Sequence, residues 1–279
     1  MTKLALRACL CLVGAAGCLA AQESEQHASP HPIVLKRDLQ TQRPLRVGIQ
    51  FGVGFGPDGG DDLFELRLRV NSIDTILAVS EDEVVELRRQ YLEFQRDQLV
   101  GGKLFNSTAE YLNGTDVVFR KTAEGVEVEV RGGTLDDYQR LLARTHFEYF
   151  VLPYPGRAVS LGESWTAEVD NFLGPEIVHL AWTENLVLTL ASIEEREGRQ
   201  IARIQGVCDL GLRASRLTGL PRPMSGPADA EWLHDMTEGR PVSFDLKGRL
   251  KDTDSTEDPG GAGANVTIRM EWTPTEKEE

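Results

Sequence analysis

The stretch Val151–Trp165 reads VLPYPGRAVSLGESW, and the rest of the chain can be organised outward from it. Pro153 and Pro155 fix their own φ angles and push the residues before them into extended backbone. Gly156 then permits a turn, and Trp165 arrives where the next strand is expected to begin. We interpret the stretch as a connection whose backbone is restricted by prolines and which places a core tryptophan at the start of a sheet.

The first 21 residues have the layout of a secretory signal peptide: two basic residues, a short apolar run and then small residues. The apolar run is too short to cross a bilayer as a helix. One alternative is cleavage after Ala20 or Ala21. The other is a lipobox-like Ala15-Ala16-Gly17-Cys18, with Ala where Leu is usual, which would leave Cys18 lipidated. Both predict an exported protein in the periplasm, in the cell envelope or outside the cell.

The net charge limits which partners the chain can bind, and the cysteine content indicates whether disulfides stabilise its fold. The formal net charge of −14 becomes −16 once Lys3 and Arg7 leave with the signal region. A chain with this much negative charge repels phosphate backbones, and we therefore expect no nucleic-acid partner. We expect membrane contact only through a lipid on Cys18. Cys208 alone lies beyond that region, which predicts a fold without an internal disulfide that relies on its core.

Composition divides the rest of the chain into two parts. Residues 22–45 are rich in proline and polar residues and read as a flexible tether. Residues 46–275 carry the apolar periodicity of a β-rich domain, with two halves that would meet near residues 150–165.

One segment has a helical pattern. Ser80 followed by Glu83 resembles a capping box, and apolar residues then recur at helical spacing at Val84, Leu87, Tyr91 and Phe94. A Gly-Gly pair follows at 101–102 and would end the helix. The pattern predicts a long helix over residues 80–100, and a second, short helix is expected from Thr134 to about His146.

Elsewhere the pattern is that of strands. Leu63–Val70, Val242–Leu250 and Asn265–Trp272 alternate apolar and polar residues, and the last two are expected to pair antiparallel. Glu195–Arg199 reads as a charged hairpin turn. The predicted fold class is mainly β (α+β): a curved antiparallel sheet or half-barrel with one long and one short helix, the long helix covering the concave or open face.

The second half resembles a known group of proteins in a few short motifs. Val159, Gly162, Ser164 and Trp165 form a V-x-x-G-x-S-W segment, and a strand, a charged glycine hairpin and further strands follow. This arrangement resembles a family of exported bacterial proteins, often from planctomycete-like genomes, that lack an assigned activity. The resemblance covers roughly residues 152–272. It implies an exported, mostly β protein and transfers no catalytic or cofactor-binding residues.

Local motifs for chemistry are absent or broken. Gly54, Gly56 and Gly59 match a dinucleotide-binding fingerprint by letter, but a strand pattern follows where a helix is needed. Ser164 begins a nucleophile-elbow motif whose second glycine is replaced by Thr166. We therefore predict no catalytic residue and no cofactor. The best metal candidates are four carboxylates in one glycine-rich loop, although they break the EF-hand pattern. They are Asp252, Asp254, Glu257 and Asp258.

Three functional hypotheses remain. The first is a non-enzymatic envelope protein that binds an apolar ligand or another envelope protein in a cavity under the long helix. The second is a hydrolase-type enzyme with a dispersed active site, for which His146, His179 or His234 near a carboxylate would be the first suspects. The third is a purely structural envelope component with a flat apolar patch.

Overall fold

The computed structural model describes residues 32–35, 38–56, 63–81, 83–147, 153–167, 181–213, 223–252 and 263–275. Most of these residues lie in β-strands, as the alternating pattern predicts. The strands are β1 (Ile33–Val34), β2 (Leu45–Gly56), β3 (Phe64–Ser80), β4 (Glu83–Val100), β5 (Lys103–Ala109), β6 (Asp116–Thr122), β7 (Gly125–Gly132), β8 (Ala158–Val159), β9 (Ser164–Thr166), β10 (Ala181–Arg196), β11 (Arg199–Leu212), β12 (Met224–Asp235), β13 (Arg240–Asp252) and β14 (Gly263–Pro274).

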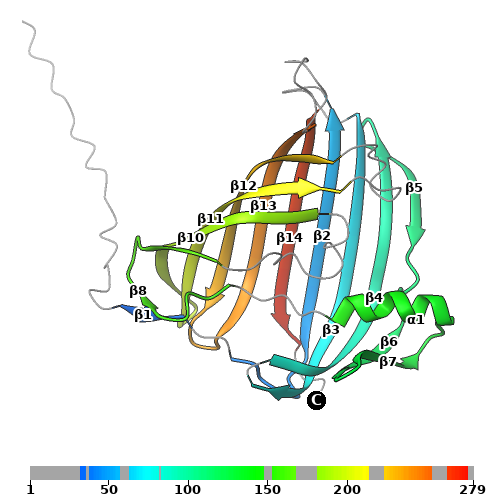
Figure 1. Cartoon of the computed structure of the whole chain (residues 1–279), viewed down its shortest axis with the longest axis horizontal. Helices are drawn as coiled ribbons and strands as arrows, with labels where there is room; N and C mark the ends of the chain where they lie inside the picture. Colours follow the sequence, from blue (N-terminus) through cyan, green and yellow to red (C-terminus); the bar gives the residue numbers. More distant parts are fainter. Residues whose placement is uncertain are drawn as a thin grey trace, which may run out of the picture.

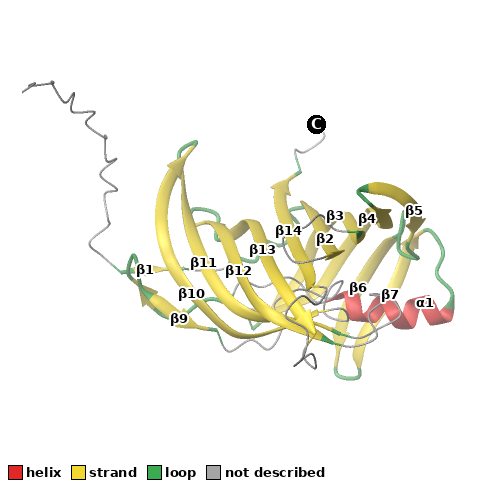
Figure 2. Cartoon of the chain, turned by 90° about the horizontal axis from the view of Figure 1, so that it is seen from above, coloured by secondary structure: helices red, strands yellow, loops and turns green. Residues whose placement is uncertain are grey.

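Twelve strands form one antiparallel sheet in the order β7-β6-β4-β3-β2-β14-β13-β12-β11-β10-β9, and β5 pairs with the far end of β4. The sheet is not closed, because β7 and β9 stand at its two ends. Figures 1 and 2 show long strands that bow, with β2 and β14 side by side near the middle. The mainly β, antiparallel prediction is confirmed, including the pairing of β13 with β14 and the tight β10–β11 turn at Gly198.

The strands alternate between two faces. We call the face that carries the core the apolar face and the opposite one the polar face. Along β14, Ala264, Val266, Ile268, Met270 and Trp272 are buried, while the residues between them are exposed or half-buried. The largest fully buried side chains lie in the same core. They are Trp232, Tyr91, Phe51, Phe119 and Phe244. The hydrophobic driving force is therefore concentrated on one side of the sheet.

The apolar face is covered by the chain's own connections. We call residues 32–35, 135–147 and 153–165 the cover, because each places apolar side chains in the core, among them Leu35, Phe147 and Val159. The expected connection ends in β9, where Trp165 is 7% exposed and its indole Nε1 donates to the Pro153 carbonyl at 3.1 Å. The short strands β1 and β8 pair with each other inside this cover.

The predicted pair of one long and one short helix is wrong. Residues 83–100 form the strand β4, and α1 (Asp137–Ala143) with the 3₁₀ turn η1 (Arg144–Phe147) makes up the helical part of the described residues. Glu83 pairs with Ser80 across the β3–β4 hairpin and binds Lys121, so it caps no helix. In both views α1 lies beside β6 and β7 (Figures 1 and 2).

Two β-bulges explain the helical spacing in β4. The pairing with β3 skips Val85 between Val84 and Leu87, and it skips Leu92 between Tyr91 and Phe94. Each extra residue shifts the alternation by one, so residues three apart share the buried face. Leu92 is consequently 51% exposed, although its neighbours Tyr91 and Phe94 are buried.

Part of the segment read as a tether contacts the sheet. Leu35 is 5% exposed, and the Asp38 amide donates to the Gly239 carbonyl at 2.7 Å. Arg43 forms an ion pair with Glu238 at 3.2 Å. The contacts of Asp38 and Arg43 fasten this part of the chain to the β12–β13 turn. No helix in the described part of the chain is long and apolar enough to span a membrane.

Candidate binding surface on the polar face

A row of polar side chains crosses the polar face at right angles to the strands. The pairing registers place each member directly opposite the next, from β9 to β4. Directly opposed residues in an antiparallel sheet stand about 4.5–5.5 Å apart, so their side chains form one continuous line. The members of this first row are Ser164, Thr189, Gln205, Glu231, Asp245, Arg269, Gln50, Arg69 and Gln95.

A second row runs beside the first, two residues along each strand, and is less polar at its β10 end. It begins at Thr166, Val187 and Val207 and continues through Asp229 and Lys247. From there it crosses Thr267, Gly52 and Arg67 to Asp97. Val207 is 54% exposed to solvent, so the second row presents an apolar surface at this end.

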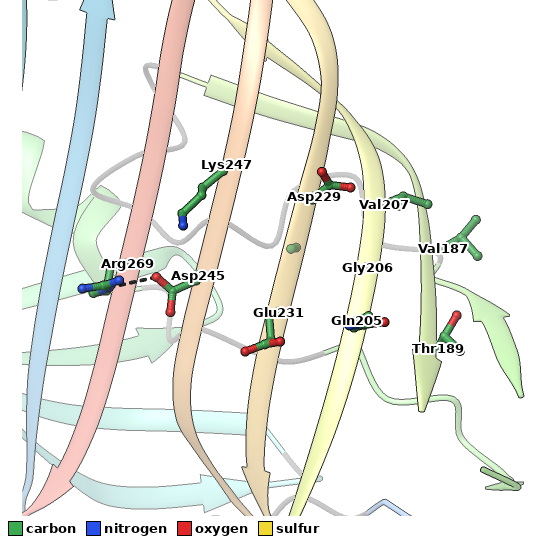
Figure 3. A pocket seen from close by; sticks show the side chains of 11 residues that line it. Val187, Thr189, Gln205, Gly206, Val207, Asp229, Glu231, Asp245, Lys247 and Arg269 are labelled. Atoms are coloured by element: carbon green, nitrogen blue, oxygen red, sulfur yellow. Dashed lines mark hydrogen bonds and ion pairs between the residues drawn. The ribbon is translucent and has the colours of Figure 1, made fainter. Parts of the chain in front are cut away.

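The two rows line an open hollow of about 610 Å³ over strands β10 to β14. Figure 3 shows the side chains of Thr189, Gln205, Glu231, Asp245 and Arg269 side by side across these strands. Its floor includes the backbone of Gly206 and Ala230. The hollow therefore offers hydroxyl, amide, carboxylate and guanidinium groups along one line, with an apolar end at Val187 and Val207.

Ion pairs fix several of these side chains. The Arg269 guanidinium donates to Asp245 at 2.8 Å, and this hydrogen bond raises the pKa of Arg269. Arg203, beside the hollow, lies 3.6 Å from Glu231. Such exposed pairs contribute little stability, but they restrict side-chain rotamers before a ligand arrives.

Two charges in the hollow are not ion-paired. Asp229 and Lys247 stand opposite each other in register, yet in the described residues neither takes part in an ion pair. Both are exposed, and in Figure 3 their side chains point away from each other. They leave one acceptor group and one donor group available to a molecule lying in the hollow.

The suspected histidines lie elsewhere. His146 is 6% exposed, and its Nε2 lies 3.0 Å from the Tyr111 hydroxyl. His234 is 1% exposed, and its Nδ1 lies 3.2 Å from the Tyr154 hydroxyl. Each tyrosine–histidine pair sits within the buried core or its cover, so the hollow on the polar face contains no histidine. His179 lies outside the described residues.

Of the candidate metal ligands and the candidate lipidation site, only one residue lies within the described residues. Asp252 is the last residue of β13, whereas Asp254, Glu257 and Asp258 lie outside the described residues, as does Cys18. Within the described ranges, no three His, Cys, Asp or Glu side chains are grouped to hold a metal ion.

The Ser164 hydroxyl of the broken elbow motif and the thiol of Cys208 both have structural surroundings. Ser164 lies in β9, and its hydroxyl is 2.7 Å from that of Thr189, with no histidine beside it in the row. Cys208 is 6% exposed, and burial raises the pKa of its thiol to about 12. A thiol held protonated in this way is a poor nucleophile.

Sequence reasoning missed the hollow because its residues come from five strands. Each strand shows a polar residue at alternate positions, which predicts only a solvated face. The available signal was the mixture of residue types at those positions, where Gln205, Glu231, Asp245 and Arg269 offer amide, carboxylate and guanidinium groups.

Comparisons with known proteins identify no family for this chain. No family model and no curated protein matches it. Among solved structures, the chain is similar to DynF from the dynemicin biosynthesis pathway of Micromonospora chersina (10% identity, 90% and 89% of the two chains, TM-score 0.23). It is also similar to the hypothetical lipoprotein YmcC from Escherichia coli (9% identity, 86% and 92% of the two chains, TM-score 0.25).

Proposed function

We propose that the protein is an exported, non-enzymatic binding module of the cell envelope, free or anchored through Cys18, that holds a polar ligand or envelope partner on the polar face. The observation that carries this proposal is the hollow over β10 to β14, where in-register side chains present donors and acceptors along one line. Exposed, partly preorganised polar groups with an apolar end are what a ligand site requires.

The location of the core supports a polar ligand over an apolar one. The apolar face is packed against the cover, with Leu35, Phe147, Val159 and Trp165 inserted into its core. An apolar ligand would have to displace these side chains and lose their burial free energy. The hollow on the polar face needs no such displacement, so it favours a ligand that forms hydrogen bonds.

The enzymatic alternative has less support. A hydrolase needs a nucleophile or activated water beside a general base that substrate can reach. His146 and His234 are buried against tyrosine hydroxyls, and the carboxylates of the hollow stand in an open, solvated surface. The structural-component alternative predicts a flat apolar patch, whereas the surface that stands out here is hollowed and polar.

Hydroxyl-radical footprinting of the protein inside the cells that express it tests the proposal directly. Purified protein and protein labelled in its own envelope are compared peptide by peptide. We expect protection in the envelope of the solvent-facing residues Val187, Gln205 and Val207, relative to the purified chain, because a bound molecule excludes water from the hollow.

A matched pair of variants gives the control. Gln205→Ala removes an exposed member of the hollow, and Glu194→Ala removes a half-buried side chain near the β10–β11 turn, outside it. The first should reduce the protection and the second should not. Equal labelling of the hollow in the envelope and in solution would refute the proposed function.

A further inference from the structure

A second hollow lies on the polar face and continues the first. It has a volume of about 360 Å³ over strands β14, β2, β3, β4 and β5. Thr267 of β14 lines it, and Arg269 of the same strand lines the first hollow. These two residues are successive outward-facing positions of one strand. The first row passes through both hollows by way of the Arg269–Gln50 pairing. The two hollows are therefore neighbours along a single line, which we call the groove.

The groove is long and narrow compared with a pocket for a small molecule. It crosses nine neighbouring strands, from β10 to β5. At the spacing of about 4.8 Å between strands, the eight steps amount to about 38 Å along a flat path. A site of these proportions suits an extended chain lying across the strands.

Gly52 keeps the middle of the groove low. It occupies the second row between Thr267 and Arg67, where every other central position carries a side chain. A Cβ atom at Gly52 would stand 2.8 Å from the Thr267 hydroxyl. A glycine inside a strand weakens the sheet and often marks a close approach of a ligand. Here it leaves the floor at backbone height where the two hollows meet.

The charges of the groove nearly cancel. Five carboxylates and four cations line it, although the chain as a whole carries a net charge of −14. In the second hollow, Arg67 pairs with Glu65 at 2.6 Å and Arg69 with Asp97 at 2.8 Å. The carboxylates are Asp229, Glu231, Asp245, Glu65 and Asp97, and the cations are Lys247, Arg269, Arg67 and Arg69. This near-neutral balance favours an uncharged ligand over a polyanion or a polycation.

We propose that the groove binds a linear, uncharged oligosaccharide or polysaccharide strand. This inference rests on the proposed function. Such a chain presents hydroxyl groups on both sides, which the carboxylate, amide, hydroxyl and guanidinium groups of the two rows can bind. An extended peptide is less suited, because it is recognised through a free sheet edge or through apolar anchors. The backbone groups of these central strands are already paired, and the large apolar side chains that the groove exposes to solvent, Val207 and Leu104, lie near its two ends.

Binding of oligosaccharides of increasing length to the purified full chain tests this proposal. The probes are linear oligomers of glucose, of mannose and of N-acetylglucosamine, from disaccharide to octasaccharide, measured by isothermal titration calorimetry. At least one series should bind, and its affinity should rise with length until the chain reaches both hollows. A polar, uncharged peptide of similar length is the competing probe.

Variants on either side of β14 separate the two hollows. Gln205→Ala, in the first hollow, should weaken short and long oligomers alike, by about three- to tenfold for a lost hydrogen bond. Gln50→Ala and Gly52→Ala, in the second hollow, should weaken only the long oligomers. Glu194→Ala lies outside the groove and serves as the control. Circular dichroism confirms that each variant is folded.

The outcomes distinguish this inference from the proposed function. If no series binds, or if only the peptide binds, the glycan inference is wrong, while protection of the hollow in the envelope footprint would still support the proposed function. If a disaccharide binds as tightly as the octasaccharide and Gln50→Ala has no effect, the two hollows do not act as one groove. The first hollow would then be a site for a small ligand. If footprint protection is also absent, both proposals fail.

Discussion

Asp74 and Arg89 lie directly opposite each other on β3 and β4 and form a two-point ion pair on the apolar face of the sheet. Their side chains are 1% and 5% exposed, and the two contacts measure 2.7 and 2.8 Å. Ser72 donates a further hydrogen bond to Asp74, and Arg89 donates to the His146 carbonyl at 2.9 Å. The pair therefore connects the sheet to its cover.

Removing one partner of this ion pair should destabilise the protein strongly. Asp74→Ala leaves the Arg89 guanidinium buried without its carboxylate, at a cost of about 3–5 kcal/mol. Urea denaturation followed by circular dichroism measures the loss. The double variant Asp74→Leu/Arg89→Met should recover much of it, because apolar side chains replace both charges. A loss below about 1 kcal/mol in the single variant would contradict the buried pair.

Trp165 should act as the anchor of the connection that precedes β9. Trp165→Ala removes a buried ring, and we expect a loss of about 3–5 kcal/mol in the free energy of unfolding. Trp165→Phe keeps most of the apolar contact but leaves the Pro153 carbonyl without its indole donor, which costs about 1–3 kcal/mol. Trp182→Phe, at a half-buried ring, is the matched control and should cost less. The opposite order of Trp165 and Trp182 effects would refute this role.

The Arg88–Asp116 pair predicts a dependence of stability on acid pH. The hydrogen bonds from Arg88 lower the pKa of Asp116 below its ordinary value of 3.8. A carboxyl with a lowered pKa in the folded state stabilises the protein above the pKa of the unfolded state. That contribution is lost as pH falls from about 4 through the lower, folded-state pKa.

Asp116→Asn should remove this contribution. At neutral pH we expect a loss of about 0.5–1 kcal/mol, because the pair is partly exposed. Below pH 3 the difference from the parent protein should shrink, since the parent carboxyl is then becoming protonated. Thermal denaturation at a series of pH values measures both, with Glu124→Gln at the exposed β6–β7 turn as control. A loss that stays constant across the acid range would contradict the assignment.

Cys208 should resist thiol reagents in the folded protein. Its pKa is raised from 9.0 to about 12 by burial, so the reactive thiolate at pH 8 is about a thousandfold rarer than for an ordinary thiol. Alkylation with iodoacetamide, followed by mass spectrometry of the peptide that contains Cys208, should be slow without urea and fast in urea. Rapid labelling of the native protein would show that β11 opens or that the thiol is accessible.

Sequence patterns predicted the strands well where the alternation is regular. In β14 every second residue enters the core, as do Phe244, Leu246 and Leu250 of β13, and the predicted segments Val242–Leu250 and Asn265–Trp272 lie inside the observed strands. Trp165 could be anticipated for a related reason: the prolines before it restrict the backbone whatever the tertiary structure is.

The same reasoning failed in β4 for a physical cause that a single sequence hides. A β-bulge adds one residue on one strand, and two bulges at Val85 and Leu92 gave apolar residues three apart, as in a helix. Only the partner strand shows that the extra residues are unpaired. The groove was hidden for the same reason, because Gln50 and Arg269 are opposed by a pairing between strands far apart in the sequence.

The position of β2 beside β14 also constrains the order in which the molecule assembles. Leu45 pairs with Pro274, so the central ladder joins the first long strand to the last. Every other neighbouring pair of long strands is close in sequence and can form as a local hairpin or meander, but this ladder carries the full entropy of closing a very long loop. While the molecule folds, the meander that starts at β2 keeps one edge open until β14 is available to pair with it. The unjoined edge is then the surface most exposed to wrong pairing, and a chaperone that shields β2 would protect folding at its slowest step.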